Sequence, residues 1–579
     1  DEVVVELDAD ELFRVTEPRD RVRLDQPGET IVRLGLAVGD AVGQGDITVR
    51  ASGGGHEASE TVHMTVRSPN PPSLDQVRAR VAPGETWTHD FTPHGLPGTN
   101  RATLEVSSVP PLNLSQRLEY LIRYPHGCLE QVTSAAFPQL YLPRLLVLDS
   151  DQGERTGANI QRAVDRLRGY QLADGSFAYW PGAASVNDWS TSYAGHFLLE
   201  ARRLGYAVPT EMLDGWREHQ RRQARAYVAS DETGQLIQAY RLYTLALAGQ
   251  PETGAMNRLR EETGLAVMAR WQLAAAYQQI GMPAVVERLV ADLGTSPPER
   301  ARPDATFAST LRDQALILPV LAARDEHDTA EALARQMADS LSGDQWHSTQ
   351  AVSWALLALS RFYGIEGQGI EGQGDEELPA LSWAWREPGQ SEWQTRHLPG
   401  VMTQQAVTPE AGEVALRNDS KQPLYLLFAN EGVPAAGQET ARTAGLRLET
   451  RFLGTDGQPL DISRLPQGTD LIARVTVTNT SGRRQTELAL TQILPSGWQV
   501  NNTRMAGEDE VAVLDYQDIR DDRVLSYLSL NAGEQRTLEL SLNASFAGRF
   551  YLPGWQVENM YDAAVQGRLA GRWVEVLAR

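Results

Sequence analysis

The chain has 579 residues, of which 41% are hydrophobic and 22% are charged, a composition typical of a soluble globular protein with several domains. Its formal net charge of −22 would repel phosphate groups and anionic lipid, so we expect no nucleic-acid partner. The sequence contains no run of roughly 18 consecutive apolar residues, which argues against a membrane-spanning helix.

The first residues carry neither the basic nor the apolar stretch of a signal peptide, and the chain does not begin with methionine. We therefore interpret it as a mature or excised fragment.

The N-terminal part alternates apolar and polar positions between Pro-Gly and Gly-rich turns. Val3–Leu7, Thr30–Leu34 and Thr61–Val66 show this period of two, which is typical of strands. The pattern predicts a small antiparallel β-sandwich over residues 1–70. Similar runs at Glu85–His89 and Ala102–Val106 predict further strands over residues 71–110.

From Leu112 onward, apolar residues recur at helical spacing, which predicts a helical domain over residues 111–370. The longest such stretches are Ile160–Leu172, Ala194–Leu204, Leu236–Leu247, Thr310–Ala323 and Thr349–Phe362. A polar loop precedes an apolar helix several times, a repeat typical of paired helices stacked in a ring or solenoid.

Strand patterns return after the helices, over residues 371–438 and again over residues 439–579. The strand segments on both sides of the helical part predict a β-sandwich that the helices interrupt. The predicted fold class is therefore a multidomain β + α protein.

Cys128 is the only cysteine, and it lies in the run Tyr124-Pro-His-Gly-Cys-Leu-Glu-Gln131. A single cysteine excludes an internal disulfide and argues against a cysteine-based metal cage, so we expect neither a metal nor another cofactor. Residues three apart on a helical turn share a face, so the Cys128 sulfur can approach the side-chain carbonyl of Gln131. Attack there with loss of ammonia would leave an internal thioester.

Local features around the pair favour this reaction. Gly127 would let the backbone turn sharply into the helix, and a helix N-terminus lowers the pKa of a nearby thiol, which favours the attacking thiolate. Glu130 would stabilise the first helical turn through the helix dipole. The alternative is a structural cysteine, since lone cysteines usually behave as small buried hydrophobes.

The residues Gly127, Cys128, Leu129, Glu130 and Gln131 closely resemble the thioester motif of bacterial alpha-2-macroglobulins, relatives of thioester complement proteins. The resemblance implies a macroglobulin-like sandwich over 1–70, a CUB-type domain formed by 71–110 and 371–438, and a C-terminal macroglobulin-like sandwich over 439–579. Between the CUB-type parts, residues 111–370 would form an inserted α/α-toroid that carries the thioester.

The resemblance also implies a cover, because an exposed thioester hydrolyses in water. Met560 and Tyr561 lie in a stretch similar to the one whose Met-Tyr pair covers the thioester in this family, so they would form the shield. Tyr124 and Trp180 would complete it, with packing in the toroid core as the alternative. His126 could act as a base, and a packing or capping role is its alternative.

The implied function is broad-spectrum trapping of proteases, without enzymatic activity. A protease would cut a bait segment, and the exposed Gln131 acyl group would then couple to a lysine amine of that protease. No bait region is recognisable in this chain. In complement relatives a toroid histidine activates the thioester toward hydroxyls, whereas His219 lies among arginines, so we expect direct attack by amines.

For the full-length protein, the resemblance implies a monomeric periplasmic lipoprotein that serves bacterial defence. Its contact with the inner membrane would be made only through a lipid anchor outside this chain. A peptidoglycan-synthesising protein is a family-level expectation for a partner.

Three alternatives stay open. The run Gln171-x-x-Asp-Gly-Ser-Phe is shared with toroid enzymes of the terpene-cyclase type, although the toroid has no Asp-x-Asp-Asp run. A cysteine hydrolase would use Cys128 with His126, two positions apart and without a third orienting group. A binding module without an active thioester is the last alternative.

Overall fold

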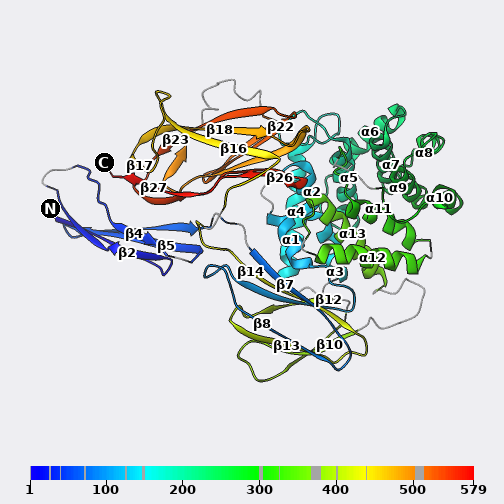
Figure 1. The fold of residues 1–579 in the computed structure, drawn as a ribbon, viewed down its shortest axis with the longest axis horizontal. Helices are drawn as coiled ribbons and strands as arrows, with labels where there is room; N and C mark the ends of the chain where they lie inside the picture. Colours follow the sequence, from blue (N-terminus) through cyan, green and yellow to red (C-terminus); the bar gives the residue numbers. More distant parts are fainter. Residues whose placement is uncertain are drawn as a thin grey trace.

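The computed structural model shows a helical region on one side and β-sheets on the other, with both termini away from the helices (Figure 1). It describes residues 2–24, 28–39, 41–68, 70, 73–123, 127–145, 150–298, 304–324, 326–343, 345–366, 380–399, 402–437, 440–501 and 514–578. None of the helices within these ranges is long and apolar enough to cross a membrane.

The N-terminal region forms a four-stranded sheet in the order β3-β1-β5-β6 and a two-stranded sheet of β2 and β4. Its strands are β1 (Glu2–Ala9), β2 (Phe13–Glu17), β3 (Arg19–Arg23), β4 (Gly35–Val38), β5 (Gly43–Gly53) and β6 (His56–Val66). The strand predicted at Thr30–Leu34 is wrong. Strand β2 ends at Glu17 opposite Gly35, so the ladder does not reach that run.

A second sandwich takes strands from both sides of the helical region. It consists of β7 (Ser73–Val81), β8 (Thr86–Phe91), β9 (Arg101–Ser107), β10 (Ala380–Arg386), β11 (Gln394–Pro399), β12 (Met402–Val407), β13 (Gly412–Asn418) and β14 (Leu424–Gly432). Its sheets have the orders β11-β10-β13-β8 and β12-β9-β14-β7. Both sheets turn buried side chains such as Trp383 and Leu104 into one core. The predicted interruption of a sandwich by helices is thus present, and we call this unit the split sandwich.

The step from the split sandwich into the helices is fixed by the buried carboxyl group of Glu105 on β9. Its two oxygens accept the backbone N–H groups of Leu112 and Leu114 at 2.9 and 3.0 Å. Between them, Asn113 adopts a left-handed φ of 52°. The carboxyl group therefore stabilises the first turn of the helical region by satisfying N–H groups at a helix start.

The helical region has thirteen α-helices within the described residues. They are α1 (Leu114–Arg123), α2 (Leu129–Ala136), α3 (Leu142–Leu145), α4 (Ser150–Leu167), α5 (Asp188–Arg203), α6 (Thr210–Ala226), α7 (Glu232–Leu247), α8 (Thr253–Arg260), α9 (Val267–Gln279), α10 (Pro283–Val290), α11 (Thr310–Ala322), α12 (His327–Ser342) and α13 (Thr349–Glu366). Short 3₁₀ turns lie at Pro138–Tyr141 and Arg168–Tyr170. The helix predicted over Ile160–Leu172 ends earlier, because Gln171 bridges to Phe177 instead.

These helices form a ring of pairs. The inner helices α2, α5, α7, α9, α11 and α13 each contact the next, and α13 returns to α2. Helices α4, α6, α8, α10 and α12 pack on the outside, where α6 exposes its charged side chains. An inner helix is apolar on most sides because it is covered by both the ring and the outer layer. The helical region therefore forms the predicted ring of paired helices.

The C-terminal region is a sandwich with sheet orders β15-β26-β25-β19-β22-β21, β16-β18-β23-β20 and β17-β27-β24. Its strands are β15 (Arg442–Ala444), β16 (Leu446–Gly454), β17 (Arg464–Pro466), β18 (Thr469–Asn479), β19 (Gln485–Ile493), β20 (Trp498–Val500), β21 (Tyr516–Ile519), β22 (Arg523–Leu530), β23 (Gln535–Ala544), β24 (Gly548–Leu552), β25 (Gln556–Asn559), β26 (Asp562–Arg568) and β27 (Arg572–Leu577).

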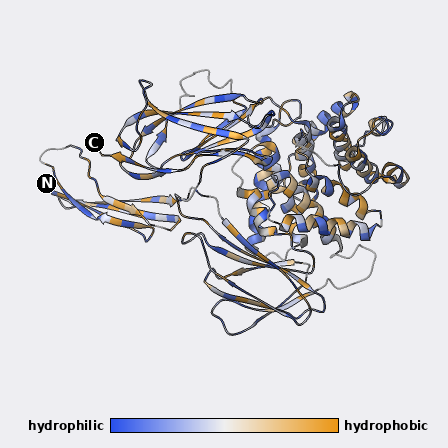
Figure 2. Cartoon of the chain, in the orientation of Figure 1, coloured by the Kyte–Doolittle hydropathy of each residue, from blue (hydrophilic) through white to orange (hydrophobic). Residues whose placement is uncertain are grey.

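One face of this sandwich packs on the helical region. Along β22, Val524 and Leu528 enter the core of the sandwich, whereas Leu525 and Tyr527 belong to the same hydrophobic cluster as the helices. This is the alternation expected of a strand covered on both faces. Figure 2 shows the corresponding alternation of hydrophobic and hydrophilic residues along the strands. The predicted β + α fold class is confirmed, and the individual domain boundaries stay predictions.

Candidate functional site

The site is built at the N-terminus of α2. Cys128 precedes the helix in an extended conformation, with φ −70° and ψ 165°. Its sulfur accepts the backbone N–H of Gln131, while its own N–H donates to Gln131 Oε1 at 3.3 Å. This reciprocal arrangement is a capping box. It holds the thiol and the carboxamide side by side over one helical turn.

Gly127 lies directly before Cys128, next to the side chains of Arg166 and Tyr170. A Cβ atom at this position would lie 2.2 Å from Nη2 of Arg166. The backbone carbonyl of Gly127 also accepts a hydrogen bond from the Tyr170 hydroxyl. The glycine therefore allows a close approach of neighbouring side chains.

The thiol of Cys128 is fully buried. Burial, and secondly the Glu130 carboxyl group, raise its pKa above the ordinary value. The expectation that the helix N-terminus would lower this pKa is wrong, because desolvation of the thiolate outweighs the helix dipole. The neutral thiol is thus the stable form in the closed structure.

Met560 and Tyr561 cover the pair from the turn between β25 and β26. Gln131 Nε2 donates to the Met560 sulfur at 3.4 Å, and the Tyr561 hydroxyl oxygen lies 3.7 Å from the Cys128 sulfur. Met560 is fully buried, and Tyr561 is 6% exposed. The C-terminal sandwich therefore closes the site from outside the helical region.

Aromatic side chains extend this cover. The Tyr561 ring packs on Phe307 with centroids 4.5 Å apart. Trp180 stacks on Tyr516 at 4.9 Å and contacts Tyr527 at 4.1 Å, both on the C-terminal sandwich. These contacts remove the surroundings of the Cys128 and Gln131 side chains from water.

Glu130 lies inside the site and not on the surface of the first turn. It is fully buried, and its carboxyl group accepts from the Tyr561 hydroxyl at 2.7 Å, from Ser134 at 2.5 Å and from Thr349 at 2.9 Å. Burial raises the pKa of this carboxyl group despite those donors. Glu130 thus connects α2 and α13 to the turn that covers the site.

Two further residues of the site were not predicted. The hydroxyl groups of Tyr179 and Tyr561 share a hydrogen bond, with 3.0 Å between their oxygens. The backbone carbonyl of Tyr179 accepts the N–H of Leu129 at 2.9 Å. The backbone carbonyl of Glu487, on β19, accepts the N–H of Met560 at 3.0 Å. Tyr179 is a neighbour of the predicted Trp180, whereas nothing in the local sequence distinguishes Glu487 from another strand residue.

Tyr124 and His126 are outside the described residues. The His219 Nδ1 atom lies 3.1 Å from the Asp174 carboxyl group, between the α6 helix and the loop before α5. Leu129, the first residue of α2, is fully buried in the helical core.

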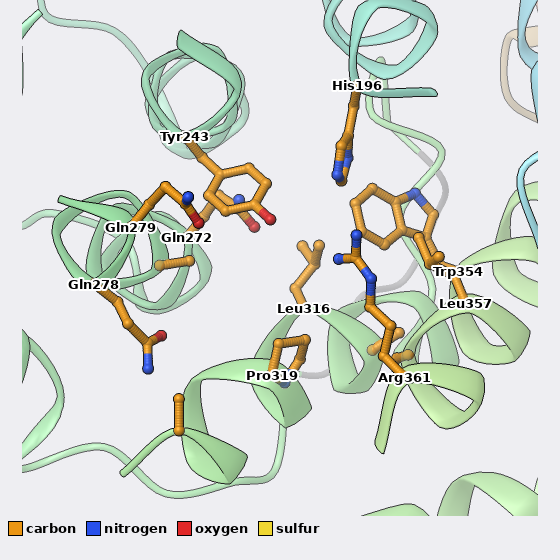
Figure 3. Close-up of a pocket in the computed structure, with 14 residues that line it drawn as sticks. His196, Tyr243, Gln272, Gln278, Gln279, Leu316, Pro319, Trp354, Leu357 and Arg361 are labelled. Atoms are coloured by element: carbon orange, nitrogen blue, oxygen red, sulfur yellow. The ribbon is translucent and has the colours of Figure 1, made fainter. Parts of the chain in front are cut away.

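A separate pocket of about 290 Å³ lies between the inner helices, lined in part by Tyr243, Gln272 and Pro319 (Figure 3). In this view His196, Trp354 and Arg361 come together on one side of it. No Asp or Glu lines the pocket within the described residues. The acidic residues that terpene-cyclase chemistry would need are therefore not among these lining side chains.

Glu200 lies beside this pocket, and it is held by cations. Its carboxyl group pairs with Arg361 at 2.7 Å and Arg203 at 2.8 Å, and it accepts from the Tyr141 hydroxyl. Burial alone would raise the pKa of Glu200, but Arg361 and the other partners outweigh burial and lower it to about 2. The His196 ring, whose pKa burial lowers to about 3, stays neutral at neutral pH.

Comparisons with known proteins agree with this architecture. Residues 103–217 match the model of the A-macroglobulin TED domain, and residues 445–563 match that of the bacterial alpha-2-macroglobulin MG10 domain. The chain is 26% identical over 528 residues to the alpha-2-macroglobulin of Escherichia coli, which covers 83% of this chain and 30% of that protein. It is also 26% identical to that of Xylella fastidiosa strain Temecula1, over 97% of this chain and 36% of the relative. The chain thus spans about a third of the length of these relatives.

Solved structures show the same arrangement of domains. Native alpha-2-macroglobulin from Escherichia coli, spanning domain MG7 to the C-terminus, superposes with a TM-score of 0.82 at 22% identity, over 100% of this chain and 94% of that chain. Salmonella alpha-2-macroglobulin reacted with methylamine gives a TM-score of 0.82 at 26% identity, over 100% of this chain and 39% of that chain.

Proposed function

Since this chain belongs to the bacterial alpha-2-macroglobulins, we propose that it is the thioester-bearing part of a protease-trapping inhibitor, in which Cys128 and Gln131 form an internal thioester. The observation that carries the proposal is the capping box of these two residues, buried under Met560 and Tyr561. That arrangement puts a nucleophile beside its electrophile in a site closed to water.

Formation of the thioester follows from the contacts of the two side chains. The Cys128 sulfur attacks Gln131 Cδ, a C–S bond forms, and the C–N bond of the carboxamide breaks. Ammonia leaves with the proton that the thiol gives up. The Cys128 N–H donates to Gln131 Oε1, the oxygen on which negative charge develops, and such a preorganised donor stabilises the transition state.

The buried carboxyl group of Glu130 gives the thiol proton a local route. The Tyr561 hydroxyl lies near the sulfur and donates to Glu130. A thiol with a raised pKa reacts slowly unless a base takes its proton, so Glu130 would assist through Tyr561.

Capture of a protease requires that the thioester be uncovered. When the C-terminal sandwich separates from the helical region, a lysine amine attacks the acyl carbon of Gln131, an amide bond forms, and the C–S bond breaks. The Cys128 sulfur leaves and takes the proton that the amine loses, so one free thiol appears for each capture. Methylamine is a small probe of this step, and the related Salmonella protein is one described as reacted with it.

The intact mass of the native chain tests the proposal. We expect a mass lower by one ammonia than the value calculated from the sequence, restored with one added methylamine after incubation with that amine. Cys128→Ala is the matched control, and it should keep the calculated mass and incorporate no methylamine. A native chain of the calculated mass with a free Cys128 thiol would show that no thioester is present, and a binding module would then be the better interpretation.

We also infer the domain division of this chain, and the location and partners of the whole protein, from the family. The division into residues 1–70, 71–110 with 371–438, 111–370 and 439–579, with a CUB-type split sandwich, is the one that the strand pairings support. Periplasmic location, a lipid anchor, proteases as covalent partners and a peptidoglycan-synthesising partner concern the whole protein, of which this chain is about a third of the length.

A further inference from the structure

The pocket shown in Figure 3 lies where five inner helices of the ring meet, and each of them contributes a lining side chain. These side chains are His196 on α5, Tyr243 on α7, Gln272 on α9, Leu316 on α11 and Trp354 on α13. Cys128 and the residues that cover it are not among the described lining residues, so this pocket is separate from the site at α2.

The carboxamide of Gln272 is a polar group without a partner in this pocket. The residue is 2% exposed, and within the described residues its side chain makes no hydrogen bond. A buried polar group that stays unpaired destabilises a folded protein, and each such exception in a native structure requires an explanation. A bound molecule that pairs with the carboxamide would supply one.

Arg361 on α13 gives the pocket a positive charge. Its contacts with Glu200 and Tyr141, both at 2.7 Å, use the nitrogen Nη2, and 21% of the side chain stays exposed. In Figure 3 the guanidinium group extends into the pocket. Glu200 is not among the described lining residues and is also paired with Arg203, so two arginines face one carboxylate and one positive charge is in excess. The pocket therefore favours an anion.

The rest of the wall is largely apolar, and the pocket is small. Leu316, Pro319 and Leu357 belong to this wall. A volume of about 290 Å³ lies at the lower end of the range of small-molecule sites, so it suits a molecule of about the size of one amino acid. Gln279 and Ala323 also line the pocket and are exposed, so a ligand can enter while Cys128 stays covered.

We propose that this pocket is a binding site for a small carboxylic acid with an apolar body: Arg361 and Gln272 hold the carboxylate, and the apolar wall contacts the body. The N–H groups of an arginine match the oxygens of a carboxylate, and the amide nitrogen of Gln272 adds a further donor. This ligand class covers a free carboxylic acid and the carboxyl end of a peptide. The inference goes beyond the proposed function and does not depend on the thioester.

The first test is a calorimetric titration of the native chain with 3-phenylpropionate at neutral pH. We expect one molecule to bind with a Kd of about 1 mM or tighter, as is usual for so small a ligand. The uncharged 3-phenylpropionamide has nearly the same shape, and it should bind about tenfold more weakly, because it lacks the charge that pairs with Arg361. No binding of the acid at about 10 mM, or equal binding of acid and amide, overturns the proposal.

Gln272→Leu separates a binding role from a structural one. Leucine has a similar volume and removes the unpaired carboxamide, so the melting temperature should rise. Binding of 3-phenylpropionate should become about tenfold weaker, because the amide donor is lost. Unchanged affinity would contradict the role of Gln272, and a fall in melting temperature together with weaker binding would assign the residue to the structure of the ring.

Two further variants test the location of the site. Gln235→Leu is the matched control, since Gln235 is buried on α7 outside the pocket and accepts the Ala266 N–H at 2.8 Å. It should lower the melting temperature and leave binding unchanged. Ala275→Leu fills part of the pocket from α9, and it should weaken binding by about tenfold or more. Full affinity in Ala275→Leu, or loss of binding in Gln235→Leu, would show that the probe binds elsewhere.

The source of the carboxylate is decided by comparing 3-phenylpropionate with the peptide acetyl-Gly-Gly-Phe, which ends in the same phenyl group and carboxylate. Tighter binding of the peptide identifies a peptide end as the ligand, and tighter binding of the free acid identifies a small metabolite; either result supports the site. Cys128→Ala should bind both probes as the wild type does, so a failure of the thioester leaves this test intact. Loss of binding in Cys128→Ala would contradict the separation of the two sites.

Discussion

The helical region buries acidic side chains at two places that differ in what surrounds them. Glu200, beside the inner pocket, pairs with Arg361 and Arg203 and ionises readily. Glu130, at the contact with the C-terminal sandwich, accepts hydrogen bonds from the hydroxyl groups of Tyr561, Ser134 and Thr349. A carboxylate paired with cations fixes the ring of helices, whereas carboxyl groups bound to hydroxyls leave a contact that can be broken. We therefore expect the first cluster to stabilise the helical ring and the second to hold a contact that opens.

The largest effect should come from removing a cation from the first cluster. Arg361→Met leaves the buried Glu200 with Arg203 and the Tyr141 hydroxyl but removes one of its two arginine partners, so we expect a loss of about 4 kcal/mol in the free energy of unfolding, measured in urea. The double variant with Glu200→Gln should recover part of that loss, because no unpaired charge remains. A single variant as stable as wild type would show that the pair does not hold the ring.

Acid should weaken the same cluster. The pKa of Glu200 is lowered from 4.5 to about 2 in the folded chain, so its contribution is complete above the higher value and is lost as the pH falls toward the lower one. We expect this loss to reach about 3 kcal/mol, measured by urea unfolding of wild type against Glu200→Gln. The variant should show a shallower dependence on pH over that range, and equal slopes would contradict the pairing.

A smaller effect is expected at the contact with the C-terminal sandwich. Met560→Ala removes the side chain that covers Gln131, and loss of this burial should weaken closure by about 2 kcal/mol. Methylamine incorporation should then be faster by about thirtyfold. Met256→Ala is the matched control, since Met256 is fully buried in the helical region and should lower the melting temperature without raising this rate.

The smallest effect should follow from the loss of one hydroxyl group. Tyr561→Phe keeps the ring on Phe307 but removes the donor to Glu130, which retains Ser134 and Thr349. We expect methylamine incorporation to be about fivefold faster, as for a hydrogen bond of about 1 kcal/mol. Tyr277→Phe removes a hydroxyl bonded to Asn257 between α8 and α9, and its rate should equal that of wild type.

The sequence could predict what depends on nearby residues. Cys128 and Gln131 are three residues apart, so their meeting follows from the geometry of one helical turn. The ring of helices followed from apolar spacing in the same way. Met560 and Tyr561 lie more than 400 residues further along the chain, and only the resemblance to a known family directed attention to them.

The properties that the sequence could not predict are those that depend on contacts between distant parts of the chain. The helix N-terminus alone would lower the pKa of Cys128, but burial under the C-terminal sandwich raises it. Glu487 lies in a strand pattern, and its backbone angle and the hydrogen bond from the Met560 N–H to its carbonyl become visible only in the fold. Thr30–Leu34 has the strand pattern as well, yet its prospective partner β2 has already ended.

The position of β9 has a mechanical consequence. This strand leads into the helices, yet it lies between β12 and β14, two strands that follow the helices in the chain. Its Glu105 also clamps the start of α1. The strand that leads into the helical ring is thereby held between two strands that follow the ring in the chain. We expect the helical ring and the split sandwich to move as one rigid unit. The C-terminal sandwich would separate from that unit when Gln131 is uncovered.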